Sequence, residues 1–508
     1  MLKTRTQQVT ASAMGVMLFT ALSKVVGFGR EMLISYHFGI GMEADAFFMA
    51  MAITGVMVSI LAAGFKPVMI PILTELGTAE EENRYINRLT KLLFIGSIIG
   101  VILLYFLAPL LIRIFARGFG DEAYELTVRL VRAGLPAVIA IIFNDLFNGY
   151  LQSRQKFIFP AIVGIPFNIP YFIFLLLMTD RYGILGLMIA GVAGNALQCV
   201  LTLLYSRKQG WRYRTESSIK DPVMDPKIRK TFLLVGPVIM GTMVRNVNVI
   251  VDRALASGLV TGSVSALNYA EKIKSMVYGV FILTVATVLY PILAREGNID
   301  EPQSFIRVLR KGVNVMVWLT LPISVGTILF AEPIVRVFFQ RGEFDAWSTG
   351  MTSFALSFYA VGFVGIGIRE ILIRGFYSLS DTKTPMKNGM IIVVMNIALN
   401  LVLVRYLDHG GLALATGIAS TLGGLLLLHS LRRKIGQLGG RRMAASFLRS
   451  ALGCGLMALG AGGIYHALMD GAWGITVPHE SIALLAAVLS GVLIYALWAY
   501  INKKAILE

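Results

Sequence analysis

Residues 45–74 read DAFFMAMAITGVMVSILAAGFKPVMIPILT, thirty positions with two charged side chains, Asp45 and Lys66. A helix crosses the hydrocarbon core of a bilayer in about 20 apolar residues, so this stretch can span a membrane with a tilt or a bend. Residues 265–294, SALNYAEKIKSMVYGVFILTVATVLYPILA, form a second stretch of the same length. Long apolar helices are therefore the expected building element of the fold.

Apolar stretches of spanning length recur along the whole chain. They cover residues 10–37, 45–74, 90–116, 126–152, 157–179, 183–206, 229–257, 264–294, 308–332, 350–376, 386–406, 411–431, 445–468 and 480–502. Of the 508 residues, 56% are hydrophobic and 15% are charged, whereas charged residues make up about 25% of ordinary soluble domains. The composition predicts an all-α polytopic membrane protein with about 14 transmembrane helices.

The two quoted stretches are also related to each other. With an offset of 220 residues, Pro71-Ile72-Leu73 falls on Pro291-Ile292-Leu293. Gly149-Tyr150 followed by Pro160 has a counterpart in Gly375-Phe376 followed by Pro385. This repeat predicts two pseudo-symmetric six-helix lobes plus two C-terminal helices. The expected division is an N-terminal lobe at 1–206, a cytoplasmic basic linker at 207–228, a C-terminal lobe at 229–432, and two helices with a cytoplasmic tail at 445–508.

The basic residues have a strongly uneven distribution. Lys and Arg number 46 against 29 Asp and Glu, and most of the cations outside the spans lie in alternate connections, as at Arg207, Lys208 and Arg212. Cytoplasmic loops of membrane proteins carry such an excess, so we predict a multi-pass membrane protein with both termini in the cytoplasm. The same distribution explains the net charge without a nucleic-acid partner. The first apolar run continues past Lys24 to Tyr36 and is interpreted as a retained span rather than a signal peptide.

Motifs for catalysis are absent from the sequence. Cys199 and Cys454 both lie in apolar stretches, and the five histidines are scattered. There is no G-x-x-x-x-G-K-[ST] loop and no H-E-x-x-H pair. We therefore expect a protein that is not an enzyme and has no resident cofactor. Transport would draw on an ion gradient, the membrane potential or the gradient of the substrate.

Charged residues inside the spans are the main functional signal. They fall mostly in the first two spans of each repeat: Lys24, Arg30, Glu31, Asp45 and Lys66 in the first, and Arg245, Asp252, Arg253, Glu271, Lys272 and Lys274 in the second. Each costs about 2.5–3.5 kcal/mol at the centre of a membrane helix on insertion scales. These groups should therefore face water or one another, and we predict that the four helices line one shared cavity.

Some of these charges have a neighbour of opposite sign. Arg30-Glu31, Asp252-Arg253 and Glu271-Lys272 could equally be neutral structural couples, whereas Lys24, Lys66, Arg245 and Lys274 have no obvious local partner. The cavity is then net positive and attracts phosphate. Candidate substrate-binding residues are Lys24, Arg30, Lys66, Arg245, Lys272 and Lys274. Candidate gate residues or structural ion pairs are Glu31, Asp45, Arg253 and Glu271.

Other polar residues within spans carry less weight. Asp145 with Asn144 and Asn148, and Arg369 with Glu370, are better explained as bonds between helices. Asn396 and Asn400 lie one helical turn apart, and with Thr416 and Asp252 they would offer oxygen ligands suited to Na⁺. Spacing alone favours hydrogen bonding between helices for this second set.

Four segments carry a resemblance to a known family. They are Lys24 to Glu31, Ala44 to Phe48, Phe339 to Phe344, and Gly375 to Ser378 continuing through Asp381 to Pro385. Together they look like the MurJ (MviN) lipid II flippases of the multidrug/oligosaccharidyl-lipid/polysaccharide exporter superfamily. The resemblance runs over nearly the whole chain, including the two last helices.

The resemblance implies alternating access of two lobes around a central headgroup cavity, with the lipid tail along a groove beside the last two helices. Lys24 stands at a family arginine position, Arg30, Glu31 and Asp45 match family charges, and Glu271-Lys272 replaces an Asp-Arg pair. A family sodium site would fall on Asp252, Asn396, Asn400 and Thr416, which makes Na⁺ a candidate coupling ion. The chain departs from the family at Met57-Val58-Ser59, where many members have two arginines.

The leading hypothesis is a flippase for lipid II, the lipid-linked peptidoglycan precursor. Its expected partners are this anionic glycolipid, membrane lipids and, as further candidates, other cell-wall synthesis proteins. The alternatives are a flippase for another polyprenyl-pyrophosphate-linked oligosaccharide, of capsule, exopolysaccharide or teichoic acid, and with less support a cation-coupled drug antiporter or a non-transporting membrane scaffold. Basic rather than acidic intramembrane residues argue against the drug antiporter.

Overall fold

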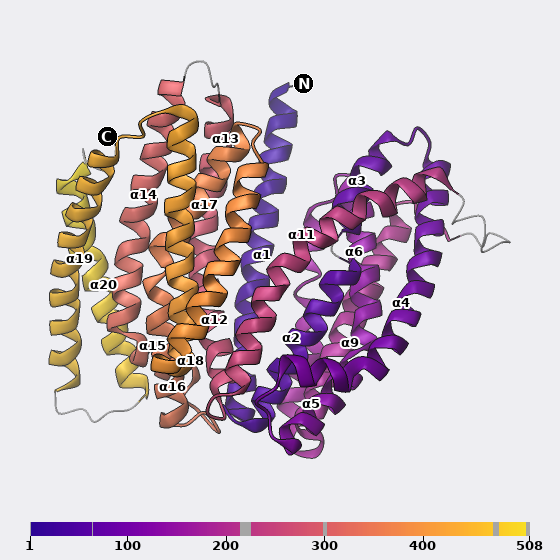
Figure 1. Ribbon diagram of the computed structural model, residues 1–508, viewed down its shortest axis with the longest axis horizontal. Helices are drawn as coiled ribbons and strands as arrows, with labels where there is room; N and C mark the ends of the chain where they lie inside the picture. The colour runs from indigo at the N-terminus through magenta and orange to yellow at the C-terminus, as the bar shows by residue number, and fades with distance from the viewer. Residues whose placement is uncertain (1, 63, 214–224, 298–301, 471–476, 504–508) are drawn as a thin grey trace. The chain divides into compact units, whose positions relative to one another are not determined.

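The computed structural model describes residues 2–62, 64–213, 225–297, 302–470 and 477–503 (Figure 1). Side-chain surroundings are described within these ranges except at residues 2–14, 61, 62, 244, 245, 302, 477 and 478. All regular secondary structure in the described ranges is helical. By internal packing the chain forms two units, Met1–Thr261 and Gly262–Glu508. Their placement relative to each other is not determined, so each is described by itself.

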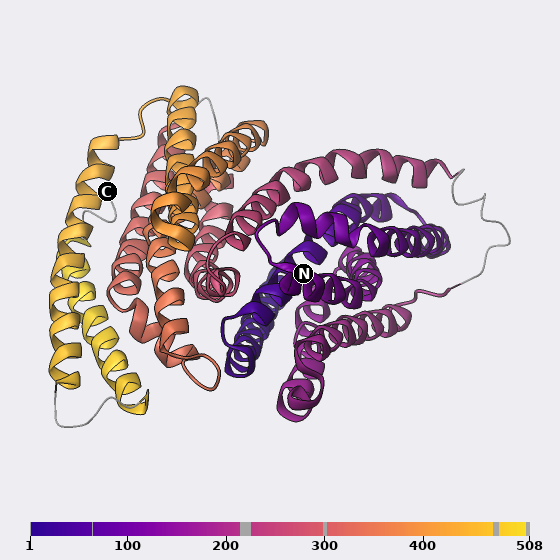
Figure 2. The ribbon, with the colours of Figure 1, turned by 60° about the horizontal axis from the view of Figure 1, so that its bottom comes forward.

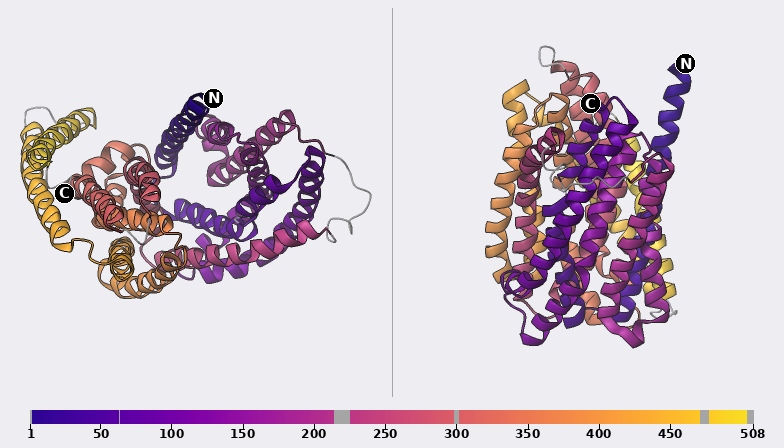
Figure 3. Two further views of the ribbon diagram at one scale, coloured as in Figure 1. Left: turned by 90° about the horizontal axis from the view of Figure 1, so that it is seen from above. Right: turned by 90° about the vertical axis from the view of Figure 1, so that its right-hand side faces the viewer.

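The described part of the first unit contains eleven helical elements. They are α1 (Leu2–Phe38), α2 (Met42–Ala62), α3 (Phe65–Glu75), α4 (Ala79–Phe115), α5 (Asp121–Gly134), α6 (Pro136–Ser153), α7 (Ile158–Ile162), η1 (Pro166–Asn168), α8 (Ile169–Leu177), α9 (Thr179–Lys208) and α11 (Pro226–Ser257). Within this unit α11 packs against α2, α3 and α4, and Figure 3 shows the helices from two further directions. The packing boundary after Thr261 thus differs from the sequence-based start of the second lobe at residue 229, because α11 packs on the first unit.

The second unit contains the remaining elements. They are α12 (Ser263–Val277), η2 (Tyr278–Ile282), α13 (Leu283–Arg295), α14 (Pro302–Leu329), α15 (Ala331–Phe339), α16 (Ala346–Val361), α17 (Phe363–Ser378), α18 (Lys383–Ile435), α19 (Gly440–Met469) and α20 (Val477–Ile501). The last two helices, α19 and α20, pack along each other and against α14, as Figures 1 and 2 show at the yellow end of the chain.

Local sequence explains where several of these helices begin. Thr78 caps α4, with its side chain accepting from the backbone N–H of Glu81 at 3.3 Å, and three glutamates follow in the first turn. Asp225 caps α11 in the same way, and Pro226 takes the first helical position, where its missing N–H costs nothing. Acidic residues at a helix start also interact favourably with the helix dipole.

Ten helices in the described residues are long and apolar enough to cross a membrane, or up to 12 if each of two bent pairs counts as one span. The predicted all-α polytopic class is therefore confirmed, while the number of fourteen stays a prediction. Two features account for the difference. The helix α1 is not in this set, and α18 is counted once, although the non-helical backbone of Asp408 (φ 46°, ψ −132°) divides its 53 residues.

The two units repeat the same irregularities. At an offset of 220 residues, the π-helical turn η2 (Tyr278–Ile282) corresponds to the last turn of α2, just before α3 begins, and Pro71 within α3 corresponds to Pro291 within α13. The α5–α6 pair bends by 41° and the α16–α17 pair by 43°. Shared breaks at matching positions confirm the sequence repeat as a repeat of structure.

A second set of matching positions shows an offset of 225 residues. Gln155 after α6 and Ser380 after α17 both have positive φ, at 61° and 55°. Gly183 in α9 and Asp408 in α18 both interrupt a helix, with φ of 52° and 46°. Left-handed backbone is uncommon at non-glycine residues, so its recurrence at Gln155 and Ser380 marks a turn that the repeat retains.

Candidate functional site

Arg30 lies in a polar cluster at the contact of α1 with η1 and α8. Its Nη2 donates to Glu31 Oε1 at 2.6 Å and its Nη1 to Asn168 Oδ1 at 3.2 Å. The guanidinium also lies over the ring of Tyr171, 4.7 Å from its centroid, and near Phe167 at 5.5 Å. Aromatic faces attract cations. The structure therefore forms the Arg30–Glu31 couple that the sequence left open, and it adds three partners that sequence spacing could not indicate.

Both acidic residues of the first two predicted spans are buried. Glu31 and Asp45 are each 3% exposed, and both have interactions with other residues. A buried carboxylate needs hydrogen bonds or a counter-charge to remain ionised. These two residues thus fit the predicted structural or gating role better than direct contact with an anionic substrate.

Lys24 differs from Arg30 in its surroundings. It lies six residues earlier on α1 and is exposed, and within the described residues it has no hydrogen-bond or ion-pair partner. An unpaired cation within a span is by default a functional candidate. Its assignment to the substrate stays a prediction.

Lys66 lies on α3 against α6. A β-carbon on Gly149 would be 3.6 Å from Lys66 Cγ, an ordinary contact distance, so the Lys66 stem lies beside Gly149. The missing side chain leaves room for the methyl group of Met69, which would be 2.3 Å from that β-carbon. One turn earlier on α6 is Asp145, and the Lys66 charge acts on its carboxylate. Asn144, next in the chain, accepts from Thr202 of α9 at 2.8 Å. This bond is the interhelical role predicted for the Asn144 group.

The α11 candidates are only partly described. Asn248 donates to Asp252 at 3.5 Å, along one turn of the helix. Asp252 and Arg253 both have further interactions, and Arg253 borders a small space beside Met49 and Phe115. The side chain of Arg245 lies outside the described residues.

On α12, the prediction that Lys274 has no local partner is wrong. Its Nζ donates to Glu271 Oε1 at 3.0 Å, and it lies 4.3 Å from the centroid of the Tyr359 ring. The sequence analysis considered a Glu271-Lys272 couple, but Lys274, three residues from Glu271 and on the same helix face, forms the ion pair. Lys272 is half-buried and also has interactions. Because Lys274 is neutralised locally, it contributes less to a positive cavity than the sequence suggests.

The four candidate sodium ligands fall in different units. Asn400 donates to Asn396 at 3.0 Å within α18, and Thr416 donates to the backbone oxygen of Leu412 at 3.1 Å. Asp252 belongs to the first unit and the other three to the second, so whether all four converge stays a prediction. The described residues hold no group of three or more His, Cys, Asp or Glu side chains that could bind a metal. Neutral amide and hydroxyl oxygens would still suit Na⁺.

Arg369 and Glu370 lie in a polar group at the contact of η2 with α17. Glu370 accepts from Tyr278 at 3.2 Å and pairs with Arg374 at 3.0 Å. The tyrosine bond joins two elements, as predicted for this pair. The sequence did not indicate Tyr278 and Arg374 as partners of Glu370, because no sequence pattern singles them out.

An apolar cavity of about 550 Å³ lies in the second unit, between α14, α19 and α20. Its lining includes Trp318, Gly326, Phe330, Met457 and Tyr495. It is open rather than sealed, and its walls are almost entirely hydrocarbon. The family resemblance implies a lipid-tail groove beside the same two helices, and the use of this cavity by a lipid tail stays a prediction.

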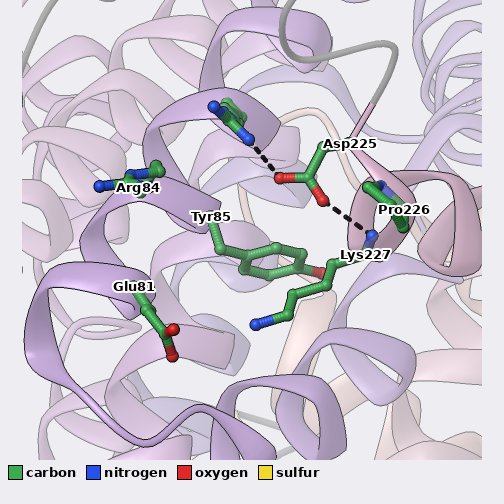
Figure 4. A pocket seen from close by; sticks show the side chains of 7 residues that line it. Glu81, Arg84, Tyr85, Asp225, Pro226 and Lys227 are labelled. Atoms are coloured by element: carbon green, nitrogen blue, oxygen red, sulfur yellow. Dashed lines mark hydrogen bonds and ion pairs between the residues drawn. The ribbon is translucent and has the colours of Figure 1, made fainter.

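A second cavity of about 480 Å³ lies where the start of α11 meets α4 (Figure 4). Arg84, Tyr85, Asp225 and Lys227 line it, and Arg88 forms an ion pair with Asp225. The Tyr85 hydroxyl lies 2.8 Å from that of Thr231, so α4 holds the start of α11 by two polar contacts.

The same part of α4 also binds the end of the preceding segment. Trp211 donates to Asn87 at 3.0 Å, and Asn87 donates to the backbone oxygen of Arg212 at 3.0 Å. Arg154 joins this region to Glu82 at 2.7 Å. Both described ends of the predicted basic linker are therefore fixed on α4, while its residues 214–224 lie outside the described residues.

The fold and the intramembrane charges define a class of protein, an all-helical membrane transporter built from two repeated units. Among solved structures, the fold is similar to "Lipid II flippase MurJ, inward closed conformation", with a TM-score of 0.80 and 24% identity over 97% of this chain and 99% of that one. It is also similar to an inward-facing multidrug resistance MATE family transporter of the MOP superfamily, with a TM-score of 0.67 and 16% identity over 83% and 98% of the two chains.

The family model described as "Lipid II flippase MurJ" matches residues 34–484, so this chain belongs to the MurJ family. Among its relatives, the lipid II flippase MurJ of Burkholderia cenocepacia is 28% identical over 82% of each chain. The probable lipid II flippases of Vibrio cholerae and of Buchnera aphidicola subsp. Baizongia pistaciae are 28% and 27% identical, over 84% and 83% of each chain. The resemblance to this family is thereby confirmed, and three of the four sequence segments lie within the matched range.

Proposed function

We propose that this protein is a lipid II flippase, which moves the headgroup of the lipid-linked peptidoglycan precursor from the cytoplasmic to the outer leaflet. The observation that carries the proposal is the family match over residues 34–484, on a fold with repeated units and cations inside its spans. It acts in the bacterial inner membrane as a multi-pass protein, with both termini in the cytoplasm according to the distribution of basic loops. The protein performs transport and no covalent chemistry.

The proposed mechanism is alternating access. Lys24, Arg30 and Lys272 bind the pyrophosphate from the cytoplasmic side, because phosphate oxygens accept charge-assisted hydrogen bonds from lysine and arginine. Reorientation of the two lobes then opens the site to the opposite side. The undecaprenyl tail stays in hydrocarbon, and the apolar cavity between α14, α19 and α20 offers it a binding surface.

The existing contacts of the Arg30 side chain limit how it can bind the substrate. Its guanidinium already bonds Glu31 and Asn168 and stacks on Tyr171. We assign it a positioning role as well as a charge, with Glu31 orienting it toward the phosphate. Na⁺ at Asp252, Asn396, Asn400 and Thr416 is the proposed coupling ion, with the membrane potential as the competing source of energy.

The experiment that tests the function combines two measurements. Expression of the chain in a flippase-depleted strain should restore growth, and the purified protein in vesicles should move lipid II faster than protein-free vesicles do. Translocation of other polyprenyl-pyrophosphate glycans in the same vesicles tests the alternative raised by Met57-Val58-Ser59. Movement of such a glycan with no movement of lipid II would contradict the proposal. Runs with and without Na⁺, and with and without an imposed voltage, identify the source of energy.

A further inference from the structure

Asp145, a carboxylate within a span, lies on α6 one helical turn before Gly149, the residue beside which the Lys66 side chain lies. Asp145 and Gly149 are four residues apart and so share a face of the helix, and the Lys66 stem lies in contact distance of Gly149. Lys66 lies nine residues before the end of α3, and Asp145 eight before the end of α6. At 1.5 Å per residue both are roughly 12–14 Å inside their helix ends. The two residues therefore lie at similar distances from the C-terminal ends of two helices that pack together.

These two charges interact without being bonded. The field of Lys66 acts on the Asp145 carboxylate, but among the described residues neither group has a hydrogen-bond or ion-pair partner. The helices packed on α6 are α2, α3, α4, α5 and α9. Of the described charged groups on these helices, Lys66 is the one that acts on Asp145. Asn144 is engaged with Thr202, and Asn148 holds a buried amide oxygen that receives no hydrogen bond within the described residues.

Two charged groups inside a membrane span that form no direct ion pair cost free energy of insertion. An ionised carboxylate in apolar surroundings relies on its counter-charge. If Lys66 turns toward a bound phosphate, the carboxylate loses that counter-charge, and the free energy of the site then favours its protonation. A lysine side chain is long and flexible enough to exchange one partner for the other.

We propose that Asp145 is the resident counter-ion of Lys66, and that it takes up one proton when the pyrophosphate of the substrate replaces it. This inference rests on the proposed function, and it adds a proton to the binding step. The proton comes from water and bonds to a carboxylate oxygen of Asp145, while the Lys66 ammonium keeps its own three protons and its charge. The neutral acid can then donate to an acceptor such as the amide oxygen of Asn148.

The sign of the pH dependence follows from this exchange. The substrate-bound state holds one more proton than the free state, so affinity rises as the pH falls, by up to tenfold per pH unit. Pyrophosphate itself also titrates, and that contribution is the same for every variant. The difference between the wild type and Asp145→Asn therefore isolates the Asp145 proton.

The test measures binding of lipid II to the purified full chain in nanodiscs, from about pH 5 to about pH 9, a range that brackets shifted carboxyl groups. We expect the affinity of Asp145→Asn to depend less on pH than that of the wild type. For each pH unit, the wild-type affinity should change by a factor up to tenfold larger than the affinity of the variant. We also expect tighter binding than the wild type at high pH, because Lys66 has no competing anion. Glu75→Gln is the matched control, since Glu75 is an exposed carboxylate on α3 paired with Lys230, and its binding should follow the wild type.

The outcomes separate this assignment from the function. If the wild type binds lipid II and Asp145→Asn shows the same pH dependence, the counter-ion assignment is overturned and the function stands. If the wild type does not bind lipid II, the function fails and the assignment fails with it. Should Asp145→Asn not reach the membrane, Lys66→Gln gives the same information, because it must lose both affinity and the proton-linked part of the pH dependence. A Lys66→Gln protein with the pH dependence of the wild type would overturn the assignment too.

Discussion

Arg30 and its chain neighbour Glu31 form a short ion pair, with Nη2 and Oε1 2.6 Å apart and the two side chains 15% and 4% exposed. Removing one partner of such a pair leaves the other charge buried, at a cost of about 3–5 kcal/mol. The loss of Arg30 thus has two separable effects, on folding and on the substrate. A substitution at Arg30 alone changes folding and substrate binding together.

The double variant Arg30→Gln/Glu31→Gln separates folding from transport. It removes both charges while keeping the volume, so we expect membrane abundance near that of the wild type, above that of Arg30→Ala. We expect no complementation from either variant, because the phosphate loses its guanidinium. Abundance by immunoblot and growth of a flippase-depleted strain are the two measurements. Growth supported by the double variant would show that the pair is purely structural.

Lys24→Gln should act on the substrate alone. Lys24 is exposed, so its replacement leaves no buried charge and should change stability by less than about 0.5 kcal/mol. We expect lipid II binding to weaken about tenfold or more, since charge-assisted hydrogen bonds contribute about 1.5–3 kcal/mol. Lys156→Gln, at an exposed cation in the turn after α6, is the control and should bind normally. Equal binding by both variants would remove Lys24 from the site.

The spans and the repeat were predictable because membrane helices must satisfy their backbone internally, which leaves a long apolar signal. The sequence repeat pairs Pro71 with Pro291, which lie in matching helices, and the division of α18 at Asp408 falls between the predicted spans 386–406 and 411–431. The packing of α11 on α2, α3 and α4 was not predictable. Repeat symmetry assigns a helix by its sequence, whereas packing depends on side chains from distant segments.

The sequence predicted which charged residues belong to the candidate site, but not which residues they pair with. Sequence identified Lys274 as a cation within a span, yet its partner Glu271 is three residues away, at 3.0 Å, rather than absent. Arg30 was expected to be open to substrate or paired with Glu31, and its contacts with Asn168 and Tyr171 come from residues over 130 positions away. Partners brought together by tertiary packing leave no mark in local spacing.

Filling the apolar cavity should impair lipid binding without disturbing the fold. Gly326 on α14 lines the cavity, and a β-carbon there would meet no atom within 4 Å. Gly326→Phe therefore places a ring in the space proposed for the lipid tail, and we expect weaker binding of lipid II with normal abundance. Gly463→Phe on α19 is the control, because that position is equally open and lies outside the cavity lining. Unchanged lipid II binding by Gly326→Phe would place the tail elsewhere.

Acid should weaken the turn between α17 and α18 through Asp381. Burial alone would raise the pKa of Asp381, but hydrogen bonds from Lys434 and Thr384 outweigh it and lower the pKa from 3.8 to about 2. A carboxyl group with a lowered pKa in the folded state stabilises that state above its unfolded pKa, here by about 2 kcal/mol. This contribution is lost as the pH falls from about 4 to about 2.

Denaturation of the wild type and of Asp381→Asn at several pH values measures this contribution. At neutral pH the variant should be less stable by roughly 2 kcal/mol, because it loses the ion pair with Lys434 at 2.8 Å. The difference should shrink below about pH 4, where the wild-type carboxyl is protonated as well. Asp470→Asn, at an exposed carboxylate after α19, should show no such convergence. A stability difference for Asp381→Asn that stays constant down to about pH 2 would mean that the aspartate acts through its shape as a turn residue rather than through its charge.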